Sequence, residues 1–148
     1  MILSTLFVVF LLLLLLSALL YIRINSRYQL MILLSAPNEV NVGDKFKIAL
    51  RIVNHSKSDQ VFEMLSLDKE FLDQFNFLGV VPNAKGQTSA LGGTGIGYQK
   101  LLRPSTSMPV ELHLEAIKPG IFIGNFSAIN SKLLTGKAAK AKITVKAG

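Results

Sequence analysis

The chain contains no cysteine, and only 17% of its 148 residues are charged. Without cysteine it can form no disulfide bond, no thiolate nucleophile, no cysteine-ligated zinc site and no acylated lipoprotein N-terminus. Acidic residues are also missing from the C-terminal part, because none follows Glu115 whereas six lysines do. The formal net charge of +7 therefore reflects a basic C-terminal end.

Polar side chains are also scarce in the first 22 residues, where the small polar ones are Ser4, Thr5 and Ser17. A helix of that length spans roughly 30 Å, which is the thickness of the hydrocarbon core of a bilayer. A cleaved signal peptide would need a basic start, a shorter apolar region and small residues at a cleavage site. Here neither Lys nor Arg precedes the apolar run, so we predict an uncleaved signal anchor.

We therefore divide the chain into a transmembrane helix at residues 1–23, a juxtamembrane linker at residues 24–27 and one domain at residues 28–148. Arg23 and Arg27 follow the helix, and the positive-inside rule favours a cytoplasmic domain. Single-anchored sandwiches in the cell envelope, by analogy, face the periplasm or the outside. The sequence leaves the side of the membrane open.

Strand patterns fill most of the remaining chain. In residues 45–52, Phe46, Ile48, Leu50 and Ile52 alternate with Lys45, Lys47, Ala49 and Arg51, and residues 110–116 alternate in the same way. Further strands are expected at residues 28–34, 61–67, 77–81, 98–102, 121–129 and 139–147. Seven or eight short strands with almost no helix predict an immunoglobulin-like two-sheet antiparallel β-sandwich.

The connections complete this expectation. The polar residues 54–59 are predicted to join two antiparallel strands, and Lys118-Pro119-Gly120 is predicted to form another turn. A short helix that starts at Asp68 is expected to cross between the sheets. The polar, glycine-rich residues 83–97 are predicted to form an irregular loop.

Two segments carry a resemblance to a known family. They are PNEVNVGDKFKI at residues 37–48, which runs on to Asn54, and KPGIFIG at residues 118–124. Both resemble bacterial and archaeal immunoglobulin-like domains of the CARDB, or cell-adhesion-related, type. The resemblance covers most of residues 28–148 and implies a sandwich, with the second segment in the hairpin between the penultimate strands. It implies no shared functional residue.

No catalytic, cofactor-binding or metal-binding residue is expected. Glu111, His113 and Glu115 share one face of a strand and can be interpreted as metal ligands, but second neighbours on a strand stand roughly 6.8 Å apart and no further ligand cluster follows. We interpret them as a solvated face. Gly-x-Ser-x-Gly and calcium-loop patterns are absent, and the acidic residues Asp68, Glu70 and Asp73 fit the wet face of the short helix.

Two segments are candidates for contact with a partner. The first is a loop comprising Gly92, Gly93, Thr94, Gly95 and Gly97, which lacks the ending of a phosphate-binding loop. The second is a lysine face comprising Lys137, Lys140, Lys142 and Lys146. These lysines can either protect an edge strand from pairing or attract an anionic envelope polymer, lipid headgroups or an acidic protein. Stacking aromatics are absent there, so no nucleic acid is expected.

The sequence therefore predicts a non-enzymatic, single-pass membrane protein of the cell envelope, whose domain serves as a protein-binding or structural module. Two alternatives remain open. One is an accessory subunit of a membrane complex, although the helix has no Gly-x-x-x-Gly face. The other is a domain that carries a metal or ligand on Glu111, His113 and Glu115.

Overall fold

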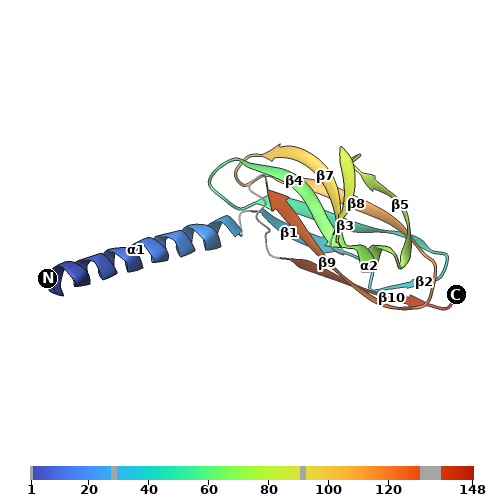
Figure 1. The fold of residues 1–148 in the computed structure, drawn as a ribbon. Helices are drawn as coiled ribbons and strands as arrows, with labels where there is room; N and C mark the ends of the chain where they lie inside the picture. The colour runs from blue at the N-terminus through green and yellow to red at the C-terminus, as the bar shows by residue number, and fades with distance from the viewer. Residues whose placement is uncertain (1, 28–29, 91–92, 131–137) are drawn as a thin grey trace.

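The computed structural model describes residues 2–27, 30–90, 93–130 and 138–148 and consists of one long helix followed by a β-sandwich (Figure 1). The helix α1 (Ile2–Arg27) continues through residues 24–27, and its described side chains are exposed from Ile2 to Tyr21. That 20-residue stretch is long and apolar enough to cross a membrane, and an N-terminal signal sequence would have the same character.

Ten strands are described, which is more than the seven or eight predicted. They are β1 (Leu30–Ser35), β2 (Glu39–Asn41), β3 (Lys45–Asn54), β4 (Gln60–Asp68), β5 (Phe75–Val81), β6 (Gly86–Ala90), β7 (Gly93–Leu102), β8 (Ser107–Ala116), β9 (Gly120–Asn130) and β10 (Ala139–Lys146). They form a four-stranded sheet in the order β1-β3-β8-β5 and a six-stranded sheet in the order β2-β10-β9-β4-β7-β6. The two-sheet sandwich is confirmed. All the strand pairs are antiparallel except β10 with β2, which is parallel.

The two predicted hairpins are wrong. Residues 54–59 connect β3 in the four-stranded sheet to β4 in the six-stranded sheet, and the turn before Gly120 connects β8 to β9 across the same gap. β3 pairs instead with β1 and β8. Both turns have the polar composition of a hairpin, but each strand buries its apolar face against the opposite sheet, and that packing determines its partners.

The glycine-rich segment is also ordered differently from the prediction. Residues 86–90 form the edge strand β6, and β7 begins at Gly93 and pairs with both β4 and β6. Gly93, Gly95 and Gly97 occupy alternate positions of β7, whereas Thr94, Ile96 and Tyr98 between them are buried. The segment therefore alternates with the period of a strand whose outward positions are glycine.

The core lies between the sheets. Ile48 and Ile52 of β3 and Leu112 and Leu114 of β8 are completely buried, as the alternation predicted. At one end of the sandwich five aromatic rings pack together, with neighbouring ring centres between 5.1 and 5.8 Å apart, and they belong to Phe46, Phe71, Phe75, Phe122 and Phe126. Burial of these apolar faces is what holds the two sheets together.

The short helix α2 (Lys69–Leu72) covers that aromatic end and crosses between the sheets as predicted. Phe71 and Leu72 point into the core. Asp68 occupies the N-cap position, but its carboxylate accepts hydrogen bonds from the backbone N–H (2.9 Å) and the side-chain amide (3.1 Å) of Asn125 instead of capping the helix. Asp68 thus ties β4 to β9 beside the helix.

Candidate binding surface

The outer face of the four-stranded sheet brings two of the three predicted acidic and histidine side chains into contact. Glu111 Oε1 lies 3.2 Å from Lys47 Nζ on the neighbouring strand, and Glu111 Oε2 lies 3.2 Å from His113 Nε2. The hydrogen bond and charge of Lys47, with those of His113, hold the pKa of the Glu111 carboxyl below its ordinary value. Glu115 accepts a hydrogen bond from Asn76 Nδ2 at 3.2 Å.

Lys47, Glu111 and His113 thus form a chain of one ion pair and one hydrogen bond, and the contact between Asn76 and Glu115 is separate from it. The register explains it, because Lys47 stands opposite His113 and Ala49 stands opposite Glu111, so that Lys47 reaches Glu111 diagonally. Among the residues that the structure describes, no group of three His, Cys, Asp or Glu side chains is placed to hold a metal ion. The sequence predicted that Glu111, His113 and Glu115 lie on a solvated face. It did not predict that Lys47 pairs with Glu111 there.

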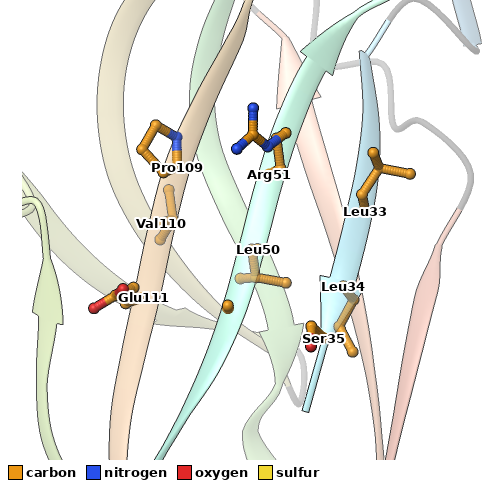
Figure 2. Close-up of a pocket in the computed structure, with 9 residues that line it drawn as sticks. Leu33, Leu34, Ser35, Leu50, Arg51, Pro109, Val110 and Glu111 are labelled. Carbon is orange, nitrogen blue, oxygen red and sulfur yellow. The ribbon is translucent and has the colours of Figure 1, made fainter.

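A hollow of about 370 Å³ lies beside Glu111 on the same face (Figure 2). It is lined by residues of three adjacent strands, which are Leu33, Leu34, Ser35, Ala49, Leu50, Arg51, Pro109, Val110 and Glu111. Ala49 lies in the middle strand between the long side chains of Lys47 and Arg51, and its single methyl group leaves the space open. We call this site the Ala49 hollow.

The walls of the Ala49 hollow differ in chemistry. Leu33 and Pro109 are its exposed apolar walls, and Leu33 keeps 56% of its surface exposed. Arg51 donates a hydrogen bond to Ser107 Oγ at 3.2 Å, while Glu111 lines the hollow two positions further along β8 than Pro109. The site therefore combines an apolar floor with one cation and one anion on the same face.

A second hollow of about 280 Å³ lies next along the same face. Lys45, Phe46, Lys47, Leu78 and His113 line it, and Leu78 is 46% exposed. The Lys47–Glu111–His113 chain separates the two hollows. Glu111 lines the Ala49 hollow, whereas Lys47 and His113 line the second one. Exposed apolar residues on this face had no signal in the sequence, because Leu33 and Leu78 lie in runs of apolar residues.

The glycine segment proposed as a partner loop is part of a sheet face instead. Gly92 lies outside the described residues, and Thr94 is buried with only 2% of its surface exposed. Gly95 and Gly97 form the floor of a hollow of about 210 Å³ with Gly86, and the surrounding side chains are Glu63, Met64, Lys85 and Gln99. Gly95 and Gly97 thus expose backbone on the six-stranded sheet.

Three of the four predicted lysines lie on one face of β10. Lys140, Lys142 and Lys146 are exposed, whereas Lys137 lies outside the described residues. Lys146 Nζ pairs with Glu39 Oε1 at 2.9 Å, and β2 covers only the last three residues of the β10 register. Ile123 of β9 stands opposite Lys142 and is 52% exposed, so an apolar side chain lies open beside the lysines of β10.

Comparison with known proteins identifies the fold. No family model matches the chain, and no curated protein matches it. A cohesin module from a family 33 glycoside hydrolase of Clostridium perfringens is similar in structure, with a TM-score of 0.58 and 10% identity over 82% of this chain and 99% of that one. AvmM, which catalyses macrocyclization in alchivemycin A biosynthesis, is similar with a TM-score of 0.53 and 12% identity, over 81% of this chain and 90% of that one.

The CARDB domain of a Pyrococcus furiosus protein gives a TM-score of 0.50 and 9% identity over 79% of this chain and 94% of that domain. The predicted likeness to the CARDB fold is thereby confirmed. At identities near 10% these similarities show the fold alone, and the similar solved structures include a protein that catalyses a reaction.

Proposed function

We propose that the chain is a non-enzymatic, single-pass membrane protein whose sandwich binds a protein partner through the Ala49 hollow. The observation that carries this proposal is the exposed apolar wall of Leu33 and Pro109, set between the cation of Arg51 and the anion of Glu111. A partner that places an apolar side chain over Ala49, with an acidic group toward Arg51 and a basic group toward Glu111, would complement both shape and charge.

Two features support binding rather than chemistry at this face. The Ala49 hollow contains no nucleophile paired with a base, because its hydroxyl is Ser35 and its ionisable groups are Arg51 and Glu111. The pKa of Glu111 is lowered, which keeps the carboxylate charged at neutral pH and unsuited to donate a proton. A charged carboxylate and a guanidinium are suited to orient a partner.

A site-specific photocrosslinker at Leu33, in cells that make the full chain, tests this proposal. Leu101 on the other sheet provides the matched control, since it is 54% exposed against 56% for Leu33. We expect a crosslinked product from position 33 that is absent from position 101. It should disappear when Ala49→Trp fills the hollow or Arg51→Glu reverses its charge, with the melting temperature of each variant checked separately. Equal crosslinking at both positions, or crosslinking that survives both substitutions, would overturn the proposal.

The membrane anchor is tested on the same preparation. An uncleaved anchor retains residues 1–22, so the intact mass of the purified chain should include them and the chain should resist extraction with alkaline carbonate. A mature protein that begins after residue 20 would show that α1 is a cleaved signal sequence. Protease treatment of intact and permeabilised cells, with a tag after Gly148, then assigns the side of the membrane.

A further inference from the structure

The end of the sandwich that receives the chain from α1 is built by loops from distant parts of the sequence. Leu30, the first residue of β1, stands opposite Asn54. The backbone of Asn54 in turn bonds to that of Ser105 and Thr106, each at 3.0 Å. Loops 55–59 and 103–106 therefore border the point of entry, and Figure 1 shows both at the end of the sandwich nearest α1. We call this region the proximal end.

The connection to α1 is too short to let the proximal end move far from a membrane. Only residues 28 and 29 separate Arg27 from Leu30. The three steps between the Cα atoms of Arg27 and Leu30 span at most about 11 Å when fully extended. The helix extends six residues beyond Tyr21, the last residue of the apolar span, which adds about 9 Å. The proximal end thus lies within about 20 Å of the hydrocarbon, and the headgroups fill the first ~5–7 Å of that distance.

The proximal end has more cations than acidic residues. Within three residues of the proximal end the described cations are Arg51, Lys57, Lys100 and Arg103, all exposed, and the acidic residues are Asp59 and Glu63. The rest of the described sandwich is close to balanced, with seven acidic residues and eight lysines. The acidic residues are Glu39, Asp44, Asp68, Glu70, Asp73, Glu111 and Glu115. In the sequence, Arg23 and Arg27 add two cations between the apolar span and β1.

We infer that the proximal end binds anionic lipid headgroups through Lys57 and Arg103, which rests on the proposed membrane anchor. Both residues stand on loops that the short connection holds within reach of the headgroups, so no further ordering of the chain is needed for contact. Each Lys or Arg near an anionic surface contributes attraction equivalent to about a fivefold change in an equilibrium constant. The contact would fix the height and tilt of the sandwich above the bilayer.

The absence of cysteine makes the experiment direct. Ser105→Cys gives the full chain a single thiol on an exposed residue of the proximal end, and a fluorophore there reports contact with a quencher on lipid headgroups. The labelled chain is reconstituted into vesicles of phosphatidylcholine, with or without phosphatidylglycerol. We expect stronger quenching with phosphatidylglycerol and loss of the difference at high salt. Lys57→Glu with Arg103→Glu should lower the ratio of contacting to free sandwiches at least about 25-fold.

Lys45→Glu with Lys118→Glu is the matched control, because it makes the same change of charge at exposed positions of the opposite end and should leave the quenching unchanged. Equal quenching in both kinds of vesicle, or equal loss in the two double variants, would overturn the lipid contact while leaving the anchor intact. Flotation with the vesicles and resistance to alkaline extraction are measured on the same samples. A chain that is lost from the vesicles would overturn the proposed anchor and this inference together.

Discussion

Gly124 on β9 leaves no room for a methyl group, and Gly124→Ala should destabilise the sandwich strongly. A Cβ atom there would lie 2.6 and 2.8 Å from Cδ1 and Cδ2 of Phe71 and closer still to its Cγ, whereas real Cβ contacts are essentially never shorter than 3.0 Å. The ring of Phe71 is 3% exposed and packs on Phe75 and Phe126 at centroid distances of 5.1 and 5.8 Å. It cannot turn away without disturbing both.

Over-packing of a core costs about 1–3 kcal/mol. The new methyl group would clash with Cγ of Phe71, which cannot move unless the whole ring moves, so we expect a cost at the upper end, about 3 kcal/mol. For a domain of this size that corresponds to a fall in melting temperature of roughly 10–15 °C. Calorimetry of the full chain in a non-ionic detergent measures it. Gly97→Ala is the control, since its Cβ would meet only Gly86 at 3.4 Å or more, and its cost should stay within about 0.5 kcal/mol.

Phe71→Leu separates the clash from any other effect of the methyl group. On its own it should cost about 1–2 kcal/mol, because a smaller side chain leaves part of the aromatic cluster unfilled. Combined with Gly124→Ala, it should remove most of the clash, so the double variant should be at least about 1.5 kcal/mol more stable than the sum of the single changes implies. Additive costs, or an unaltered melting temperature for Gly124→Ala, would refute the reasoning.

Three further predictions concern polar groups. Asn54→Ala should destabilise the sandwich by about 2–4 kcal/mol in denaturant titrations, because the buried amide donates to two backbone carbonyls at 2.9 Å and accepts two bonds from Ser56. The pKa of Glu111, measured by NMR, should rise in Lys47→Met, and the stability advantage of the wild-type pair should disappear as pH falls below the ordinary carboxyl pKa of 4.5. Burial raises the pKa of Tyr98 to about 12, so its absorbance should report phenolate only near that pH, and stability should fall as pH rises from 10 toward 12 because the unfolded phenol ionises first.

The strands were predictable where a single strand contains its own signal. Val110, Leu112, Leu114 and Ala116 alternate with polar residues, and each is at most 1% exposed. Gly93, Gly95 and Gly97 alternate in the same way with the inward residues Thr94, Ile96 and Tyr98, but closely spaced glycines predict a loop. Pairing of β7 with β4 and β6 on its two edges outweighs that local preference.

The pairing of strands and the binding surface were not predictable in this way. The turns at residues 54–59 and before Gly120 have the local chemistry of hairpins, yet each leads into the opposite sheet. Which sheet a strand joins depends on where its apolar face is buried, and the turn carries no information about that. The Ala49 hollow likewise needs β1, β3 and β8 in one register, so Ala49 in isolation has no signal.

The direction of the strands determines how a partner can reach the Ala49 hollow. Ala49 is five residues and Arg51 three residues from Asn54 along β3. At about 3.3–3.4 Å per residue, the centre of the hollow lies some 17 Å from the proximal end and its Arg51 wall some 10 Å. The hollow opens on the side of the sandwich, because it lies on a sheet face and the strands lie lengthwise between the proximal end and the opposite end. With the proposed anchor, and with the strands along the membrane normal, a partner anchored in the same membrane has to project beside the sandwich to fill it. In that orientation the binding proposal requires a partner with a folded domain or an extended segment outside the membrane.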